Sequence, residues 1–212
     1  MSLEAHNAKF ERRLTRLEGD FLRYAGSQMS HYERWYRLEG LLSQAWQSWG
    51  EFCRSVVVES CLGTVALGGR AILRANPGWT TEQRVCYEAH CAIWNNTPKP
   101  GKIISRRKEH TWGDVGKLVV VVGKLQPANS VQLLGGFGSG LAGPNHLQTV
   151  RNAAAHINPD NAAEVRRLKA YYFGPSLRHP TDLATWSNIT SRTPAFVAWL
   201  LDMRAMAAVT IQ

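Results

Sequence analysis

Apolar residues recur every three or four positions through the first quarter of the chain, which is the spacing of amphipathic helices. From residue 3 to 25 this pattern predicts one helix, and Ser30 is typical of the residue that caps a second. The second helix is expected to run to about residue 62, where Gly68-Gly69 and Asn76-Pro77-Gly78 interrupt the chain. The apolar stripes of these two helices are Phe10, Leu14, Leu17 and Phe21, and then Trp35, Leu38, Leu42, Trp46, Trp49 and Cys53.

Shorter elements are expected after these two helices. A helix is predicted to begin at Thr80 with the sequence TEQRVCYEAHCAIW and to end at Asn95-Asn96. The valine-rich segment 112–125 is compatible with a strand or with a short buried helix, and Lys117 and Lys124 favour the helix. Further helices are expected over about 146–157, 161–173 and 194–209, and no repeat of fixed period is present. The sum predicts an all-α protein, a helical bundle in a single domain over residues 1–212.

Two segments between helices carry motifs. Residues 98–111 form a basic connector that contains Arg106, Arg107 and Lys108. Residues 133–144, with the sequence LLGGFGSGLAGP, are predicted to form a glycine-rich loop that contains a literal G-x-G-x-x-G. A dinucleotide site needs a strand before this motif and a βαβ unit around it, and the chain lacks that alternation. We therefore expect a loop between helices and no cofactor; a nucleotide-cofactor enzyme is the third-ranked functional hypothesis.

The charge of the chain narrows the class of partner. Lys and Arg number 25 against 16 Asp and Glu, so the formal net charge is +9. An excess of this size favours polyanionic partners, with nucleic acid ahead of anionic membranes. Eighteen of the cations are arginines, which suit bidentate contacts with phosphate. RNA is the expected partner, and Arg106, Arg107 and Lys108 are candidate contacts to its backbone, although a merely solvated loop has the same composition.

The cysteines and the hydropathy of the chain bear on its compartment. Cys53, Cys61, Cys86 and Cys91 contain no C-x-x-C pair and lie in apolar segments, which is typical of reduced core residues. No metal site is expected, since His90 beside Cys91 has no second pair of ligands. The N-terminal segment is charged throughout, unlike a signal peptide, and the apolar run at 118–122 is too short to span a bilayer. A cytoplasmic protein without membrane contact is expected.

The sequence RNAAAH at residues 151–156 is the strongest candidate for chemistry. Asn145 and Gln148 have the spacing of a capping box, and Pro159 should end the helix near Ile157. At about 100° per residue, Asn152 and His156 share one face of this helix, and Arg151 lies at its border. The opposite face is expected to be buried through Leu147, Val150, Ala154 and Ile157.

These three side chains suit transesterification within RNA. A histidine in the last turn of a helix has its charged form stabilised, and it could move a proton at the 2′-hydroxyl or at the leaving 5′-oxygen. Arg151 would stabilise the charge that gathers on the phosphate, and Asn152 would orient His156 or the phosphate. The alanines between them leave a shallow surface that a second helix could approach closely. No metal is needed for this chemistry.

Arg151, Asn152 and His156, placed late in a basic helical chain, resemble the signature of the HEPN superfamily. The resemblance implies a bundle of four or five helices, a homodimer with two facing motifs, and metal-independent endoribonuclease activity that leaves a 2′,3′-cyclic phosphate. It also implies a toxin or anti-phage defence role, often beside an antitoxin partner. The alternative is a non-catalytic helical module that binds RNA or nucleotide, or pairs with a defence or toxin–antitoxin partner.

Overall fold

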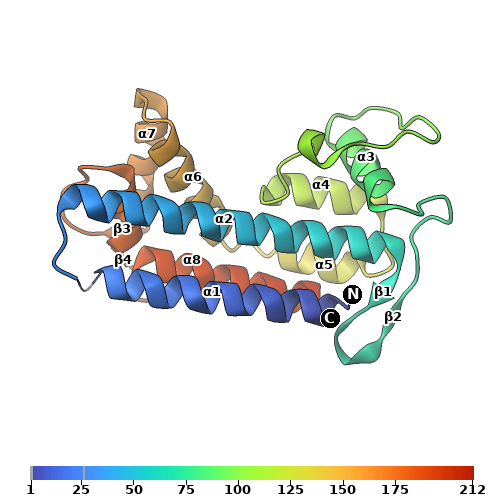
Figure 1. The fold of residues 1–212 in the computed structure, drawn as a ribbon, viewed down its shortest axis with the longest axis horizontal. Helices are drawn as coiled ribbons and strands as arrows, with labels where there is room; N and C mark the ends of the chain where they lie inside the picture. Colours follow the sequence, from blue (N-terminus) through green and yellow to red (C-terminus); the bar gives the residue numbers. More distant parts are fainter. Residues whose placement is uncertain (1, 26) are drawn as a thin grey trace. The chain divides into compact units, whose positions relative to one another are not determined.

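The protein is predominantly helical. The computed structural model describes residues 2–25 and 27–212 (Figure 1). The α-helices are α1 (Leu3–Ala25), α2 (His31–Leu62), α3 (Glu82–Ile93), α4 (Val115–Leu125), α5 (Ser130–Phe137), α6 (Gly143–Ala155), α7 (Pro159–Arg167) and α8 (Ala195–Thr210). Short 3-10 helices are η1 (Leu67–Gly69), η2 (Arg106–Lys108), η3 (Leu168–Ala170) and η4 (Pro180–Thr185).

Strands contribute little to the described part of the chain. Strand β1 (Thr64–Val65) pairs antiparallel with β2 (Ala71–Ile72), and β3 (Tyr172–Phe173) pairs antiparallel with β4 (Ser187–Asn188). The all-α prediction is therefore confirmed. The valine-rich segment is the helix α4, capped by Asp114, whose side chain accepts a hydrogen bond from the backbone N–H of Lys117.

The chain divides into two compact units. The first unit consists of Met1–Phe10, Trp49–Leu141 and Ala205–Gln212, and the second of Glu11–Ser48 and Ala142–Arg204. Helices α1, α2 and α8 each contribute residues to both units. The prediction of a single domain stays a prediction.

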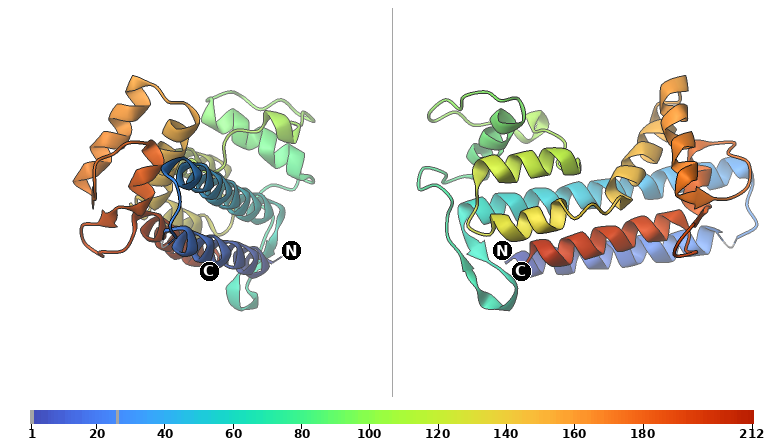
Figure 2. Two further views of the ribbon diagram at one scale, coloured as in Figure 1. Left: turned by 60° about the vertical axis from the view of Figure 1, so that its left-hand side comes forward. Right: turned by 180° about the vertical axis from the view of Figure 1, so that it is seen from behind.

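Aromatic packing defines the core of the first unit. Phe10 stacks on Phe52 with ring centroids 4.7 Å apart, and Trp49 lies 5.9 Å from both rings. Trp49 is fully buried, and its indole N–H donates to the carbonyl of Gly113 at 3.0 Å. Helix α4 packs against both α3 and α5, and the first turn of α1 lies beside the last turn of α8 (Figures 1 and 2).

The four cysteines also belong to this core. Cys53, Cys61, Cys86 and Cys91 are free and buried, as their apolar surroundings predicted. Burial raises the pKa of Cys61 and of Cys86 to about 12, so both thiols stay protonated near neutral pH. These side chains act as small apolar residues.

The core of the second unit lies along α1, α2 and α8. Phe21 of α1 meets Phe196 of α8 with ring centroids 4.9 Å apart, and both side chains are fully buried. In the same unit, Arg204 of α8 forms ion pairs with Glu11 at 3.0 Å and with Glu18 at 2.8 Å of α1. The apolar stripe predicted for α1 is buried as expected, and Ser30 caps α2 by accepting a hydrogen bond from the backbone N–H of Glu33.

The predicted glycine-rich loop is wrong over most of its length. Residues 133–137 belong to helix α5, and α6 already begins at Gly143, so only residues 138–142 form the connection. The reason is close packing: a Cβ on Gly136 would lie 2.8 Å from the carbonyl oxygen of Met206 and would also meet Thr210 of α8. Glycine is therefore required here for helix contact and not for flexibility.

The helix expected over 161–173 also differs. Helix α7 begins at Pro159, two residues earlier, with Asn158 as its cap, and it ends at Arg167. The chain then passes through η3 into β3, where Tyr172 is buried and pairs with Asn188. Tertiary pairing therefore overrides the helical pattern after residue 170.

The adjacent glycines 135 and 136 provide a matched test of this packing. We expect Gly136→Ala to destabilise the protein by about 1–3 kcal/mol, because the added methyl group overpacks against α8. Gly135→Ala should be neutral or stabilising by about 0.5–1 kcal/mol, since its Cβ would meet only Val209 at an ordinary 3.7 Å. Urea unfolding measures both values. Equal effects of the two substitutions would contradict the assigned contact.

Candidate functional site

Helix α6 carries the RNAAAH sequence, and its first residue fixes it against α8 within the second unit. A Cβ on Gly143 would lie 2.8 Å from the carbonyl oxygen of Trp199, so glycine permits the close approach. The backbone N–H of Gly143 donates to Asp202 Oδ2 at 2.8 Å. Burial raises the pKa of Asp202, and hydrogen bonds from the backbone of Gly143 and Ala142 partly oppose this. The carboxylate meets the positive end of the helix dipole.

The predicted capping box is therefore wrong. The N-cap residue of α6 is Ala142, which makes no side-chain cap. Asn145 lies inside the helix, where its backbone carbonyl accepts a hydrogen bond from the Thr149 hydroxyl. Asp202, which lies 59 positions after Gly143 in the chain, supplies the acceptor that local sequence was expected to provide.

A buried polar network supports the next turn of α6. His146 Nδ1 lies 2.8 Å from the hydroxyl of Tyr172, and the indole N–H of Trp199 donates to the same hydroxyl at 2.7 Å. His146, Tyr172 and Trp199 thus form one buried hydrogen-bond network centred on the Tyr172 hydroxyl. Burial lowers the pKa of His146 and raises that of Tyr172 to about 12, in keeping with this arrangement.

This network was not predicted from the sequence, because His146 and Tyr172 lie far apart in the chain and belong to no common motif. The spacing of four residues between His146 and Val150, which places both on one face of the helix, was the available signal that His146 is buried. The network holds the motif helix in position. It presents no exposed reactive group.

The buried face of α6 differs from the predicted one at its C-terminal end. Leu147, Val150 and Ala153 are buried, whereas Ala154 is only partly buried and Ile157 is 70% exposed. The helix ends at Ala155, two residues earlier than predicted, so the helical periodicity does not extend to Ile157.

Arg151 and Asn152 are brought together by the structure. The guanidinium Nη1 of Arg151 donates to the Asn152 side-chain oxygen at 3.0 Å, and both residues are partly buried. The asparagine amide thus orients the arginine.

His156 was predicted to lie in the last turn of the helix, and this prediction is wrong. The histidine is the C-cap residue, with φ −139° and ψ 76°, and its backbone N–H donates to the carbonyl of Asn152. The side-chain amides of Asn158 and Asn161 donate to the carbonyl of His156 at 3.2 and 2.7 Å, which fixes the corner before α7. The imidazole is exposed and hydrogen-bonds to neither Arg151 nor Asn152, nor to any other residue that the structure describes.

A small hollow lies beside Arg151, between α6 and α2. Its volume is about 40 Å³, and Glu39, Ser43 and Ala155 line it together with the arginine. That volume is close to the share of liquid occupied by one water molecule, about 30 Å³, and far below a nucleotide. This hollow is therefore too small to enclose a nucleotide.

The basic connector is fixed to the first unit by an ion-pair cluster. Arg106, Arg107 and Lys108 form η2 and are exposed. Next to them, Glu109 receives two hydrogen bonds from the buried Arg54, at 2.7 and 3.0 Å. Burial raises the pKa of Glu109, but the hydrogen bonds from Arg54 and Trp112 outweigh it and leave the pKa below its usual value. The three cations are thus held on an anchored segment.

His110, the residue after Glu109, is half-buried, and both of its ring nitrogens are buried. Neither ring nitrogen has a partner among the described residues, and the ring packs on Trp112 with centroids 4.1 Å apart. Burial lowers the pKa of His110 to about 4. The imidazole is therefore neutral in the fold at neutral pH.

Comparison with known proteins assigns no family. No protein-family model, curated protein or solved structure matches the chain. In the described part of the chain no helix is long and apolar enough to cross a membrane. Residues 2–25 and 27–212 contain no cluster of three or more His, Cys, Asp or Glu side chains suited to a metal ion.

The pKa of His110 predicts how stability depends on pH. The pKa of His110 is lower in the folded state than in the unfolded chain. Its neutral form therefore contributes its full share of the free energy of unfolding above pH 6.5, and this share is lost as the pH falls towards 4. From about pH 7 to pH 5 the contribution of His110 to this loss should be about 2 kcal/mol at most. His110→Phe should remove that contribution and leave a remainder from His146, whose pKa is also lowered by burial. Urea unfolding at both pH values tests this. The exposed-site control His31→Phe should keep the wild-type loss, and an unchanged pH dependence in His110→Phe would contradict the prediction.

Proposed function

We propose that the protein is a metal-independent endoribonuclease of HEPN type that cleaves RNA by attack of the 2′-hydroxyl on the adjacent phosphate. The observation that carries the proposal is the arrangement at the end of α6. An arginine oriented by its neighbouring asparagine lies five positions before an exposed histidine, and Ala155 between them is also exposed. The resemblance of RNAAAH to the superfamily signature supports the same activity, as does the net charge of +9.

The chemistry assigns a separate role to each side chain. A base removes the proton of the 2′-hydroxyl, the 2′-oxygen bonds to phosphorus, and the bond to the 5′-oxygen breaks as an acid protonates that oxygen. Arg151 contacts the phosphate oxygens and stabilises the charge that develops on them. His156, exposed and free to approach a ligand, performs proton transfer. Asn152 is a positioning residue for Arg151.

A dimer would supply what one copy lacks. The reaction needs both an acid and a base, and each copy of the motif contributes one histidine. The hollow beside Arg151 is also too small to enclose a nucleotide. Two motif surfaces facing each other would provide two histidines and a cleft, and the small side chain of Ala155 is exposed where such a copy would approach.

A non-catalytic RNA-binding module is the second candidate. The observation that favours it is the anchored and exposed triplet Arg106, Arg107 and Lys108, which suits backbone contacts without cleavage. A defence role beside an antitoxin or another partner is compatible with either candidate.

Substitution at the motif tests cleavage directly. Wild-type protein should cleave RNA in excess EDTA, and His156→Asn should lower the rate at least about 100-fold, because general acid–base catalysis is lost. Arg151→Lys should also lower the rate, since an ammonium group cannot make the bidentate contact. Gel analysis of a labelled RNA measures both effects.

The matched controls are His31→Asn and Arg12→Lys, which alter exposed residues outside the motif. They should retain wild-type rates. Mixing Arg151→Ala with His156→Asn should restore partial cleavage if the site is composed from two copies. Equal activity of wild type and the motif variants would refute the nuclease proposal and favour the binding module.

The basic triplet is expected to set the salt dependence of RNA binding. Replacing Arg106, Arg107 and Lys108 with glutamine should reduce the slope of log K against log salt by up to about 2, because each phosphate neutralised on a single strand contributes about 0.7. Fluorescence anisotropy with a labelled single-stranded RNA measures the slope. Glutamine at the exposed residues Lys9, Arg12 and Arg16 removes the same charge. An equal reduction in that control would show that net charge alone, and not the triplet, sets the slope.

A further inference from the structure

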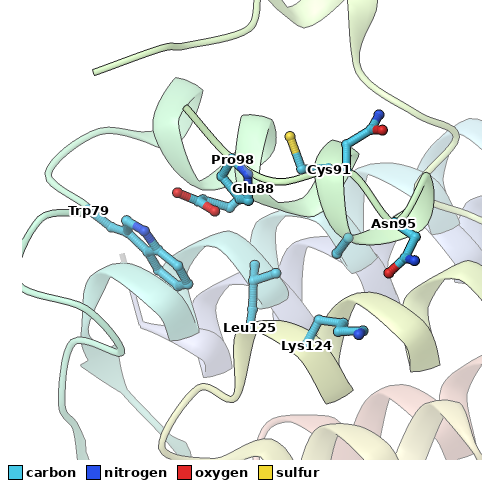
Figure 3. A pocket seen from close by; sticks show the side chains of 9 residues that line it. Trp79, Glu88, Cys91, Asn95, Pro98, Lys124 and Leu125 are labelled. Atoms are coloured by element: carbon cyan, nitrogen blue, oxygen red, sulfur yellow. The ribbon is translucent and has the colours of Figure 1, made fainter. Parts of the chain in front are cut away.

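A second pocket lies in the first unit, apart from the residues assigned to RNA. Its volume is about 210 Å³, and it is formed by α3, the segment after α3, the end of α4 and the turn that carries Trp79 (Figure 3). Groups of opposite charge line it at two ends. Its lining includes Trp79, Glu88, Cys91, Asn95, Lys124 and Leu125.

At one end of the pocket lies the carboxylate of Glu88, which a hydrogen bond from Arg84 fixes in position. Glu88 is buried, and one of its carboxylate oxygens accepts a hydrogen bond from Arg84. Arg84 is itself fixed, because its other terminal nitrogen donates to the carbonyls of Lys99 and Lys102 at 2.6 and 2.8 Å. The second oxygen of Glu88 remains available. Trp79 lies on the same side of the pocket (Figure 3), and an indole face attracts cations.

The other end carries an ammonium group and an amide. Lys124, in the last turn of α4, is exposed and has no ion-pair partner among the described residues. Asn95 lies beside it in Figure 3, and its backbone is left-handed at φ 50°, so the chain turns there and presents the side chain to the pocket. An ammonium and an amide N–H₂ together are suited to a carboxylate.

The middle of the pocket is apolar. Leu125 and Cys91 form its walls between the two charged ends. A volume of 210 Å³ corresponds to roughly seven water molecules at about 30 Å³ each, which is below the size of sites for larger ligands. The pocket therefore suits a short chain of methylene groups with a charge at each end.

We propose that this pocket binds a small zwitterion of the ω-amino acid class, with its ammonium group at Glu88 and Trp79 and its carboxylate at Lys124 and Asn95. The apolar walls contact the methylene chain. Binding at this site does not depend on the proposed RNA cleavage.

Isothermal titration calorimetry on the full chain tests the proposal with defined probes. Either 4-aminobutyrate or 6-aminohexanoate should bind saturably below about 10 mM. Hexylamine and hexanoate, which each carry one of the two charges, should bind at least about tenfold more weakly, because each leaves one end of the pocket unpaired. Absence of binding by both zwitterions, or equal binding of the singly charged analogues, would overturn the proposal.

Variants locate the site. Lys124→Gln and Glu88→Gln should each weaken zwitterion binding at least about tenfold. Glu88→Gln removes the Arg84–Glu88 ion pair and can disturb folding. Lys124 is on the surface, so Lys124→Gln tests the site in a folded protein. The controls Lys9→Gln and Glu4→Gln change exposed residues of the same charge in the first unit and should bind as the wild type does. Undiminished affinity in Lys124→Gln would place binding elsewhere and refute the assignment.

Discussion

Close contact of two glycines with the backbone of α8 is the constraint on which the positions of α5 and α6 depend. In the first unit Gly136 brings α5 against Met206 and Thr210, and in the second unit Gly143 brings the start of α6 against Trp199 and Asp202. At Gly143 the approach also lets a carboxylate from α8 cap the helix. The contact therefore sets both where the motif helix begins and which of its faces is buried.

The start of α6 in turn determines how its far end presents the motif. Because the helix begins at Gly143 and ends at Ala155, Arg151 and Asn152 lie within it while His156 lies just beyond it. The arginine is held by the asparagine, and the histidine ring stands free at the corner before α7. In the proposed transesterification the arginine would contact the phosphate and the histidine would transfer a proton. The histidine is exposed to solvent, and in the proposed dimer a second copy would cover it and supply a second histidine.

The sequence predicted the long helices well, because periodicity over twenty or more residues leaves few alternatives. The stripe of Phe10, Leu14, Leu17 and Phe21 and the Ser30 cap are both present. Errors arose where a partner far along the chain decides the local structure. Residues 133–137 contain glycines that are typical of a loop, yet contact with α8 makes them helical. Asp202 replaced the expected capping box, and Tyr172 joined a strand pair and a buried histidine instead of a helix.

The candidate site was predictable in residue type but not in geometry. Its three side chains lie within six consecutive positions, so the motif can be found in the sequence alone. The hydrogen bond between Arg151 and Asn152, and the position of His156 at the C-cap, depend on a helix end that Pro159 only roughly defines. The zwitterion pocket left no signal in the sequence, since Trp79, Glu88, Asn95 and Lys124 come from four separate places on the chain.

Mass analysis of the RNA ends produced in excess EDTA tests the central claim most directly. The proposed attack of the 2′-oxygen predicts a 2′,3′-cyclic phosphate on one fragment and a free 5′-hydroxyl on the other. It also predicts that 2′-O-methylation of the nucleotide at the cleavage site abolishes the reaction. Fragments that end in a 3′-hydroxyl, or cleavage that continues at the methylated position, would contradict the account.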